Sequence, residues 1–313
     1  MLALMVALTV LAHLIIPPFF LGWIFLASSN NRLQWLTRVL AVGGYIGLMW
    51  KGGAGWDWFG TYWPFVFGVL YFATVAYRFP QFLVAPWIPE KKIKSWAEIV
   101  FQLGLAILLS AGIPETLTAR NFAPEKAIAL SFPLRGGTFH VGHGGSNETM
   151  NQHHRVPAQR HALDIVKVNS FGIRALGFLP EDLTKYAAFG AEVVAPCSGE
   201  ILGSESELAD QTPPQMDPKH LAGNHLIIYC KDSSILLAHL KFGTVSLKPG
   251  DKVEEGSIVG QVGNTGNTSE PHLHVHAVAG RHGLEREIAG SAEGIPILFD
   301  GKYLVRNDRV LKP

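Results

Sequence analysis

The chain has 313 residues, of which 48% are hydrophobic and 16% are charged, and its formal net charge is +1. This near balance of charge excludes the broad basic surface of a nucleic-acid-binding protein, so we expect no nucleic-acid partner. The apolar residues are concentrated before about Pro114, and the later sequence is rich in glycine, histidine and charged residues. The asymmetry predicts a membrane region followed by a globular domain.

Two uncharged segments in the first third are long enough to cross a lipid bilayer. Residues 2–30 contain no Asp, Glu, Lys or Arg, and residues 58–77 form a second uncharged segment between Asp57 and Arg78. About 20 apolar helical residues span the hydrocarbon core. A cleavable signal peptide has a basic residue ahead of a shorter apolar stretch, so we expect residues 2–30 to remain as a membrane span.

Residues 35–50 are apolar apart from Thr37 and Arg38 near their start, and residues 96–113 are largely apolar, with Glu98 near one end. A charge near a helix end can snorkel to the interface, so we expect both segments to span, with an interfacial or re-entrant helix as the alternative. The predicted architecture of residues 1–114 is therefore an all-α transmembrane region of about four helices. We expect it to act as an anchor in the lipid bilayer.

Basic residues predict the orientation of this region. With four spans, Arg32 lies on the same side of the membrane as the loop that carries Arg78, Lys91, Lys92 and Lys94. The positive-inside rule makes that side cytoplasmic. We therefore expect a multi-pass protein of the cell membrane whose C-terminal domain is extracytoplasmic. If one of the four segments did not cross the membrane, the C-terminal domain would lie on the cytoplasmic side or the positive-inside rule would be violated.

A linker is expected over residues 115–129, and an all-β, antiparallel-sheet domain over residues 130–313. Helical periodicity is almost absent there, and short β-type runs alternate with glycine and proline. These runs are residues 130–132, 162–168, 191–195, 225–230, 235–239, 258–262 and 272–277. A long irregular insertion is expected from Gly203 to Ala222. Cys197 and Cys230 lie at the ends of two runs and are either a disulfide or two buried thiols.

Histidines are the most informative feature of this domain, which contains every histidine of the chain except His13. Three of them alternate with Leu273 and Val275 in the run PHLHVH of residues 271–276. Alternate residues of a strand share a face, so the three imidazoles project to one side and the two apolar residues face the core. Neutral imidazole is the commonest zinc ligand, and a catalytic zinc site has three protein ligands and one open position. A polar strand face turned to solvent would give the same alternation.

Several phrases occur in a specific order between about Leu163 and Ala277. They are "ALDI", "GAEVVAPCSGEILG", "LLAHL" and "GDKVEEGSIVGQVGNTGNTSEPHLHVH". This order resembles the lysostaphin or LytM-type zinc endopeptidases, which hydrolyse peptidoglycan peptides. The resemblance implies a sheet of the barrel-sandwich hybrid type and one Zn²⁺ per chain.

The resemblance also implies roles for single residues. Asp164 and His274 match two metal ligands, and His239 and His272 match the two catalytic histidines that do not bind metal. Zinc lowers the pKa of a bound water toward about 7 and polarises the scissile carbonyl. His239 and His272 are then expected to transfer protons and stabilise the developing oxyanion. His276 stands where the family often has Glu, and it is expected to orient a neighbouring residue.

The third metal ligand departs from the family pattern. The family has a histidine four residues before the aspartate, and this position is Arg160 here. His161 is three residues from Asp164, which places it on the opposite face of a regular strand. The pair His153-His154 precedes this strand. We predict that His154 supplies the third imidazole, with His153 and His161 as the alternatives.

These observations predict a membrane-anchored zinc metalloendopeptidase that hydrolyses peptidoglycan stem or cross-link peptides. Because Arg160 stands at a ligand position, the alternative is a metal-free, inactive relative that binds wall peptide or activates another hydrolase. A lipoyl- or biotinyl-carrier domain also shows the phrase "GDKVEEGSIVG", but it needs a modifiable lysine at a hairpin tip. No Met-Lys motif occurs in this sequence.

Overall fold

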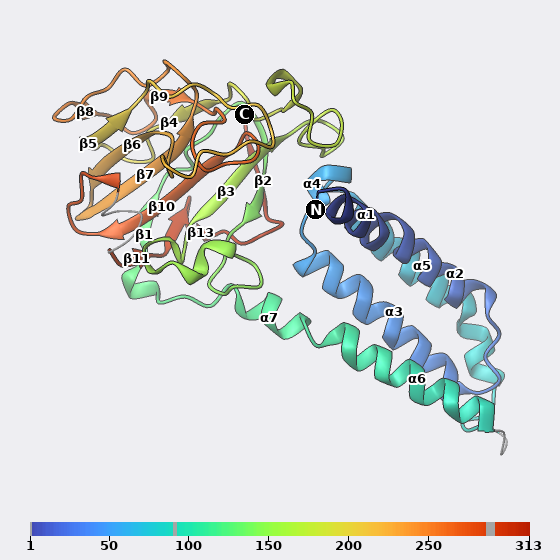
Figure 1. The fold of residues 1–313 in the computed structure, drawn as a ribbon. Coiled ribbons are helices and arrows are strands. Elements are labelled where there is room, and N and C mark those ends of the chain that lie inside the picture. The colour runs from blue at the N-terminus through green and yellow to red at the C-terminus, as the bar shows by residue number, and fades with distance from the viewer. Residues whose placement is uncertain (1, 90–92, 286–291) are drawn as a thin grey trace. The chain divides into compact units, whose positions relative to one another are not determined.

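The computed structural model describes residues 2–89, 93–285 and 292–313 (Figure 1). The chain divides into two compact units. The first comprises Met1–Trp56 and Tyr62–Leu117, and the second comprises Asp57–Thr61 and Thr118–Pro313. The first unit is helical, and the second contains all the strands in the described part of the chain.

Long helices build the first unit. They are α1 (Leu2–Val10), the π-helix η1 (Leu11–Ile15), α2 (Ile16–Leu26), α3 (Arg32–Gly52), α5 (Trp63–Val84), α6 (Ile93–Ser110) and the short α7 (Ile113–Thr118). The π-helical turn lies directly before Pro17 and Pro18, because proline lacks the N–H that an α-helical turn would use. Asn31 caps α3, since its side chain accepts a hydrogen bond from the Gln34 backbone N–H at 2.8 Å.

Three helical stretches are long and apolar enough to cross a membrane by length and composition: Val6–Leu26, Trp63–Val84 and Ile93–Thr118. They overlap the predicted spans at residues 2–30, 58–77 and 96–113. The predicted span at residues 35–50 falls within α3, which is not among these three, so four spans remain a prediction. The predicted loop around Arg78 is wrong, because α5 continues to Val84. Lys91 and Lys92 lie outside the described residues.

The two charges in the weaker predicted spans pair with each other inside the helical unit. Arg38 on α3 is 3% exposed, and its Nη2 lies 2.9 Å from Oε1 of Glu98 on α6. Gln102 Nε2 donates to the same carboxylate oxygen at 2.8 Å. The Arg38 charge is therefore satisfied by an internal ion pair instead of by the snorkelling that the sequence suggested.

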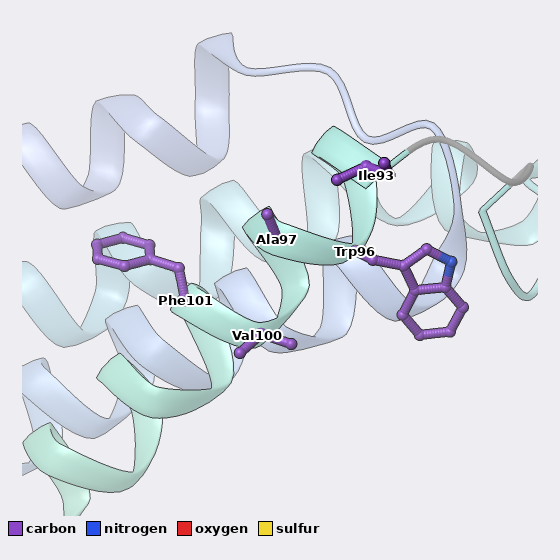
Figure 2. A pocket seen from close by; sticks show the side chains of 5 residues that line it. All are labelled: Ile93, Trp96, Ala97, Val100 and Phe101. Atoms are coloured by element: carbon purple, nitrogen blue, oxygen red, sulfur yellow. The ribbon is translucent and has the colours of Figure 1, made fainter.

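The outward surface of α6 is apolar. A shallow hollow on this helix is lined by Ile93, Trp96, Ala97, Val100 and Phe101 (Figure 2). Val69, Phe72 and Leu108 are also largely exposed on the helical unit. Exposed apolar surface of this extent is unusual on a water-soluble protein.

The central sheet of the second unit has nine strands in the order β14-β2-β3-β10-β7-β6-β5-β8, with β11 also paired to β10 (Figure 1). Its strands are β2 (Gly137–His143), β3 (Leu163–Val168), β5 (Gly199–Glu205), β6 (Asn224–Cys230), β7 (Ser233–Leu240), β8 (Lys252–Val253), β10 (Leu273–Ala279), β11 (Gly294–Ile295) and β14 (Arg309–Lys312). All neighbours in this sheet are antiparallel. The predicted antiparallel β domain is confirmed.

Smaller elements complete the second unit. β1 (Ile128–Leu130), β12 (Ile297–Phe299) and β13 (Lys302–Tyr303) form a three-stranded sheet, and β4 (Glu192–Val194) pairs with β9 (Ile258–Gln261). Short helices are α4 (Trp56–Phe59) at the boundary of the two units, and the 3-10 helices η2 (Pro124–Lys126), η3 (Gln152–Arg155), η4 (Pro157–Gln159) and η5 (Leu183–Lys185). The stretch from 206 to 223 contains no helix or strand, close to the predicted insertion.

The core of the domain lies against one face of the central sheet. Leu273 and Val275 on β10 are fully buried there, as the alternation predicted, together with Ile165 on β3 and Leu237 on β7. Of the two states expected for Cys197 and Cys230, the structure has the disulfide.

The segment Asp57–Thr61 belongs to the second unit although it lies between α3 and α5 in sequence. The Arg174 backbone N–H donates to the Asp57 carbonyl at 2.8 Å, and the Arg174 guanidinium lies over the Trp58 ring at 4.2 Å. Arg174 Nη1 is 3.4 Å from the Asp57 carboxylate, and Nη2 is 2.6 Å from the Glu270 carboxylate. A buried cation is thus held between two acidic side chains that are far apart in sequence.

Candidate metal centre

Strands β3 and β10 bring a carboxylate and an imidazole together. The two strands are antiparallel neighbours, and the register places His274 directly opposite Asp164. Directly opposed residues project from the same face of a sheet. His274 Nδ1 lies 2.9 Å from Asp164 Oδ1. This face is opposite the one on which Leu273 and Val275 enter the core.

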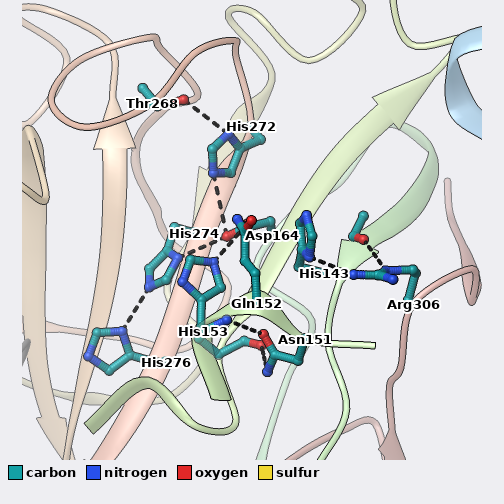
Figure 3. A network of polar contacts seen from close by, with 12 residues as sticks. His143, Asn151, Gln152, His153, Asp164, Thr268, His272, His274, His276 and Arg306 are labelled. Carbon is teal, nitrogen blue, oxygen red and sulfur yellow. Dashed lines mark hydrogen bonds and ion pairs between the residues drawn. The ribbon is translucent and has the colours of Figure 1, made fainter. Parts of the chain in front are cut away.

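A second imidazole approaches the same carboxylate from the turn η3. Asn151, which is fully buried, accepts a hydrogen bond from the His153 backbone N–H and donates its own side-chain N–H groups to the carbonyls of Gly145 and Ala162. Asn151 thereby ties the turn to the start of β3. His153 Nε2 lies 2.8 Å from Asp164 Oδ2. Figure 3 shows His153, Asp164 and His274 converging, and their ligand atoms all lie within 4.8 Å of one another.

His154, which we predicted as the third ligand, lies away from this cluster. Its Nδ1 donates to the Arg160 carbonyl at 3.1 Å, and its ring lies nearly perpendicular to that of His161, with 6.5 Å between the centroids. Successive side chains of a 3-10 helix point roughly 120° apart, so His153 and His154 cannot face the same site. His161 is also elsewhere, with Nδ1 2.8 Å from the Tyr303 hydroxyl. The structure therefore brings His153 to the position that we assigned to His154.

His272 and His239 stand beside the three-residue cluster. His272 Nδ1 donates to the Glu270 carbonyl at 2.9 Å, and its Nε2 is 3.4 Å from Asp164 Oδ1. His239 Nδ1 donates to the Thr265 carbonyl at 2.8 Å. The rings of His239 and His272 are 4.9 Å apart. The structure thus brings His239, His272, Asp164 and His274 together, and both non-cluster histidines have Nε2 free of the backbone.

The backbone of His239 is strained. Its φ is +62°, in the left-handed region that residues with a side chain rarely adopt. The His239 N–H donates to the Ala222 carbonyl at 2.9 Å, which helps to hold this conformation. Such strain concentrates at functional sites.

Opposing effects set the protonation of the site. Burial opposes the ionisation of Asp164, but His153 and His272 outweigh it and hold the pKa of Asp164 well below its usual range. Burial lowers the pKa of His239 and that of His274. Burial acts in the same direction on His272, yet the Asp164 charge and hydrogen bond prevail and raise its pKa. At neutral pH the cluster therefore combines an ionised carboxylate with neutral imidazole at His274.

His276 supports His274 from behind. His274 Nε2 lies 2.9 Å from His276 Nδ1. If Nδ1 of His274 holds a cation, Nε2 of His274 carries the proton and donates a hydrogen bond to Nδ1 of His276. This contact would fix the tautomer of a ligand, which is the orienting role expected of His276.

Sequence reasoning gave His143 and Arg306 no role, yet both adjoin the cluster. His143 ends β2 and lies opposite Asp164 at an irregularity of the β2–β3 pairing. Arg306 Nη2 donates to His143 Nδ1 at 2.9 Å. Burial lowers the pKa of His143 to about 4, against the opposing effect of Asp164. These two residues are 163 positions apart, and neither lies in a motif.

The family model of peptidase family M23 matches residues 183–284. This segment includes His239, His272 and His274, while Asp164 and His153 precede it. By class, the second unit therefore contains a peptidase domain. Residues 183–284 are this M23 domain, and the match confirms the predicted resemblance to the lysostaphin and LytM-type family. None of the curated proteins compared with the chain matches it significantly.

Solved structures of peptidases share short stretches with the chain. A zinc-containing peptidase from Vibrio cholerae is 24% identical over 30% of this chain and 25% of its own, with a TM-score of 0.22. The antimicrobial peptidase lysostaphin from Staphylococcus simulans is 20% identical over 35% and 43%, with a TM-score of 0.23. The catalytic domain of a variant of the prophage-encoded M23 protein EnpA from Enterococcus faecalis is 23% identical over 33% and 72%, with a TM-score of 0.20.

Proposed function

We propose that the protein is a zinc metalloendopeptidase that is anchored in the cell membrane and hydrolyses peptide bonds of peptidoglycan. One observation carries the proposal. His153, Asp164 and His274 converge within 4.8 Å beside His239 and His272, on a domain that belongs to peptidase family M23.

The donor set fits one zinc ion. Two imidazoles and a carboxylate are a ligand set of catalytic zinc sites, which leave a fourth position for water or substrate. Asp164 is held ionised, and His276 and Asn151 orient the two histidines, so the ligands need little rearrangement. Bound zinc would polarise the scissile carbonyl and make water a stronger nucleophile.

The other two histidines would transfer the proton and stabilise the developing negative charge. His239 and His272 each fix Nδ1–H on a backbone carbonyl, so a neutral ring presents a bare Nε2 to the site. Since His239 is held neutral and the pKa of His272 is raised, their environments separate a base from a donor. His239 Nε2 would take the proton of the attacking water and pass it to the leaving amine, while His272 stabilises negative charge on the carbonyl oxygen.

The substrate and location follow from the family resemblance and the helical unit. Lysostaphin-type relatives suggest wall stem or cross-link peptides as substrate. The apolar outer surface of α6 and the three apolar stretches favour a multi-pass anchor in the lipid bilayer. The Cys197–Cys230 disulfide favours an oxidising, extracytoplasmic side for the peptidase domain.

An inactive, metal-free relative was the alternative, because Arg160 stands at the usual ligand position. The placement of His153 weakens the reason for this alternative, since the His153 imidazole reaches Asp164 from the turn η3 and completes a three-residue cluster. No observation favours the alternative over a working site.

Zinc content tests the proposal and names the third ligand. The full chain, purified in detergent, is expected to hold about one zinc per chain and to release peptide fragments from peptidoglycan. His153→Ala should lose both properties, and the neighbouring His154→Ala is the matched control that should keep both. Zinc loss in His154→Ala alone would overturn the ligand assignment. A wild type that takes up no zinc when zinc is supplied would overturn the proposed function.

A further inference from the structure

Arg306 is buried and makes three hydrogen bonds, one of which is to His143. Arg306 is 8% exposed. Its Nε donates to the Gly142 carbonyl at 3.1 Å and its Nη1 to the Thr149 carbonyl at 2.7 Å. The third nitrogen, Nη2, donates to His143 Nδ1 at 2.9 Å. Two backbone carbonyls therefore aim the guanidinium at one ring nitrogen.

The chemistry of this contact decides the state of His143. A guanidinium has only N–H donors, so Nδ1 must be the acceptor. An imidazole that accepts at Nδ1 is neutral and carries its proton on Nε2. In this state neither nitrogen offers a lone pair to a metal or to a proton. Unlike His239, whose neutral ring presents a bare Nε2, His143 can only donate.

The donor lies at the metal centre. The two nitrogens of an imidazole point to nearly opposite sides of the ring, so Nε2–H points away from Arg306. Figure 3 shows the His143 ring between Arg306 and Asp164, and its centroid is 6.1 Å from that of His153. Within residues 2–89, 93–285 and 292–313, Nε2 has no hydrogen-bond partner, and the side chain is only partly buried. The N–H group is thus available to a molecule that enters the site.

We propose that His143 is a further catalytic residue, whose Nε2–H donates to the carbonyl oxygen of the bound peptide, and that Arg306 is the positioning residue that keeps this donor in place. The inference rests on the proposed peptidase function. The hydrogen bond strengthens as the carbonyl oxygen becomes negative during attack, so it stabilises the transition state more than the bound substrate. The buried charge of Arg306 polarises the ring and makes its N–H a better donor.

Substitution of His143 tests the role of the donor. In the full chain, His143→Phe keeps a flat ring but removes the N–H, and we expect kcat to fall by about 10²- to 10³-fold while zinc content and KM change little. His143→Gln restores an N–H donor and should recover part of kcat. His220→Phe is the matched control, because the half-exposed His220 pairs with Asp217 outside the cluster, and it should keep wild-type kcat. A His143→Phe enzyme with wild-type kcat would overturn the inference.

The tautomer of His143 is a second readout that does not depend on activity. In ¹⁵N NMR of the ring nitrogens, wild-type His143 should show a protonated Nε2 and an unprotonated Nδ1 from about pH 5 to about pH 8. Arg306→Met should mix the tautomers or allow a second proton in this range, and Arg306→Lys should retain more of the wild-type state. A proton on Nδ1 of the wild type would overturn the assignment even if the enzyme is active. An inactive, zinc-free wild type is the separate result that rejects the proposed function.

Discussion

The residues of the site differ in how far the sequence could predict them. Asp164, His239, His272 and His274 lie in recognisable phrases, and the structure brings all four together. The choice between His153 and His154 depends on the direction of a turn that buried Asn151 fixes, and adjacent residues of such a turn face apart. No spacing rule contains this information.

A pair of histidine variants should separate metal binding from proton transfer. His274→Ala removes a group of the three-residue cluster, so we expect it to abolish zinc retention and hydrolysis. His239→Ala leaves the cluster intact and should lower the hydrolysis rate by about 10²- to 10⁴-fold with zinc retained. Zinc content per chain and the rate of peptide release measure the two effects. Equal zinc loss in both variants would show that His239 is a ligand.

Among the elements, the register of β3 and β10 positions the site. A slip of one residue would turn Asp164 toward the core, so the buried side chains on the opposite face also fix the positions of Asp164 and His274. Apolar runs predicted β3, β6, β7 and β10. The pattern missed β2 and β5, because GTFHVGH and GEILGSE contain glycines and polar residues that weaken the alternation. Strand β2 is the element that carries His143.

The glycine-rich turn before β10 should tolerate substitution unevenly. Gly266 has a φ of +86°, and a Cβ there would lie 2.6 Å from the Gly223 Cα and the His220 carbonyl oxygen. Gly256 has a φ of +83° but open space around it, which makes it the matched control. We expect Gly256→Ala to lower the free energy of unfolding by about 1 kcal/mol and Gly266→Ala by about 2–4 kcal/mol. Equal losses in chemical denaturation would argue against close packing of this turn.

For the whole molecule, the change of composition near Pro114 predicted a helical part and a β part, and both are present. The number of membrane crossings was harder to predict, because α3 combines a suitable length with polar and charged residues. Arg38 pairs with Glu98 inside the helical unit, and a helix with such internal partners need not face lipid along its whole length. Hydropathy along the sequence does not detect this pairing.

Epitope tags at the two ends of the full chain should determine whether the chain crosses the membrane four times or three times. With four spans, both tags are expected to be accessible to antibody in intact spheroplasts, because the positive-inside rule leaves both ends outside. With three spans, only one tag would be accessible before permeabilisation. An inaccessible C-terminal tag would contradict an extracytoplasmic peptidase domain.

The segment Asp57–Thr61 makes the second unit discontinuous in sequence. Its Asp57 is one of two carboxylates around buried Arg174, and the other, Glu270, offers its carbonyl to His272. A protease that cut the chain after α7 would release a fragment without this segment, and the fragment would expose the side of Arg174 that Trp58 covers. The second unit is therefore not complete without residues that precede α5 in sequence, and a fragment cut after α7 is expected to hold His272 less firmly than the full chain does.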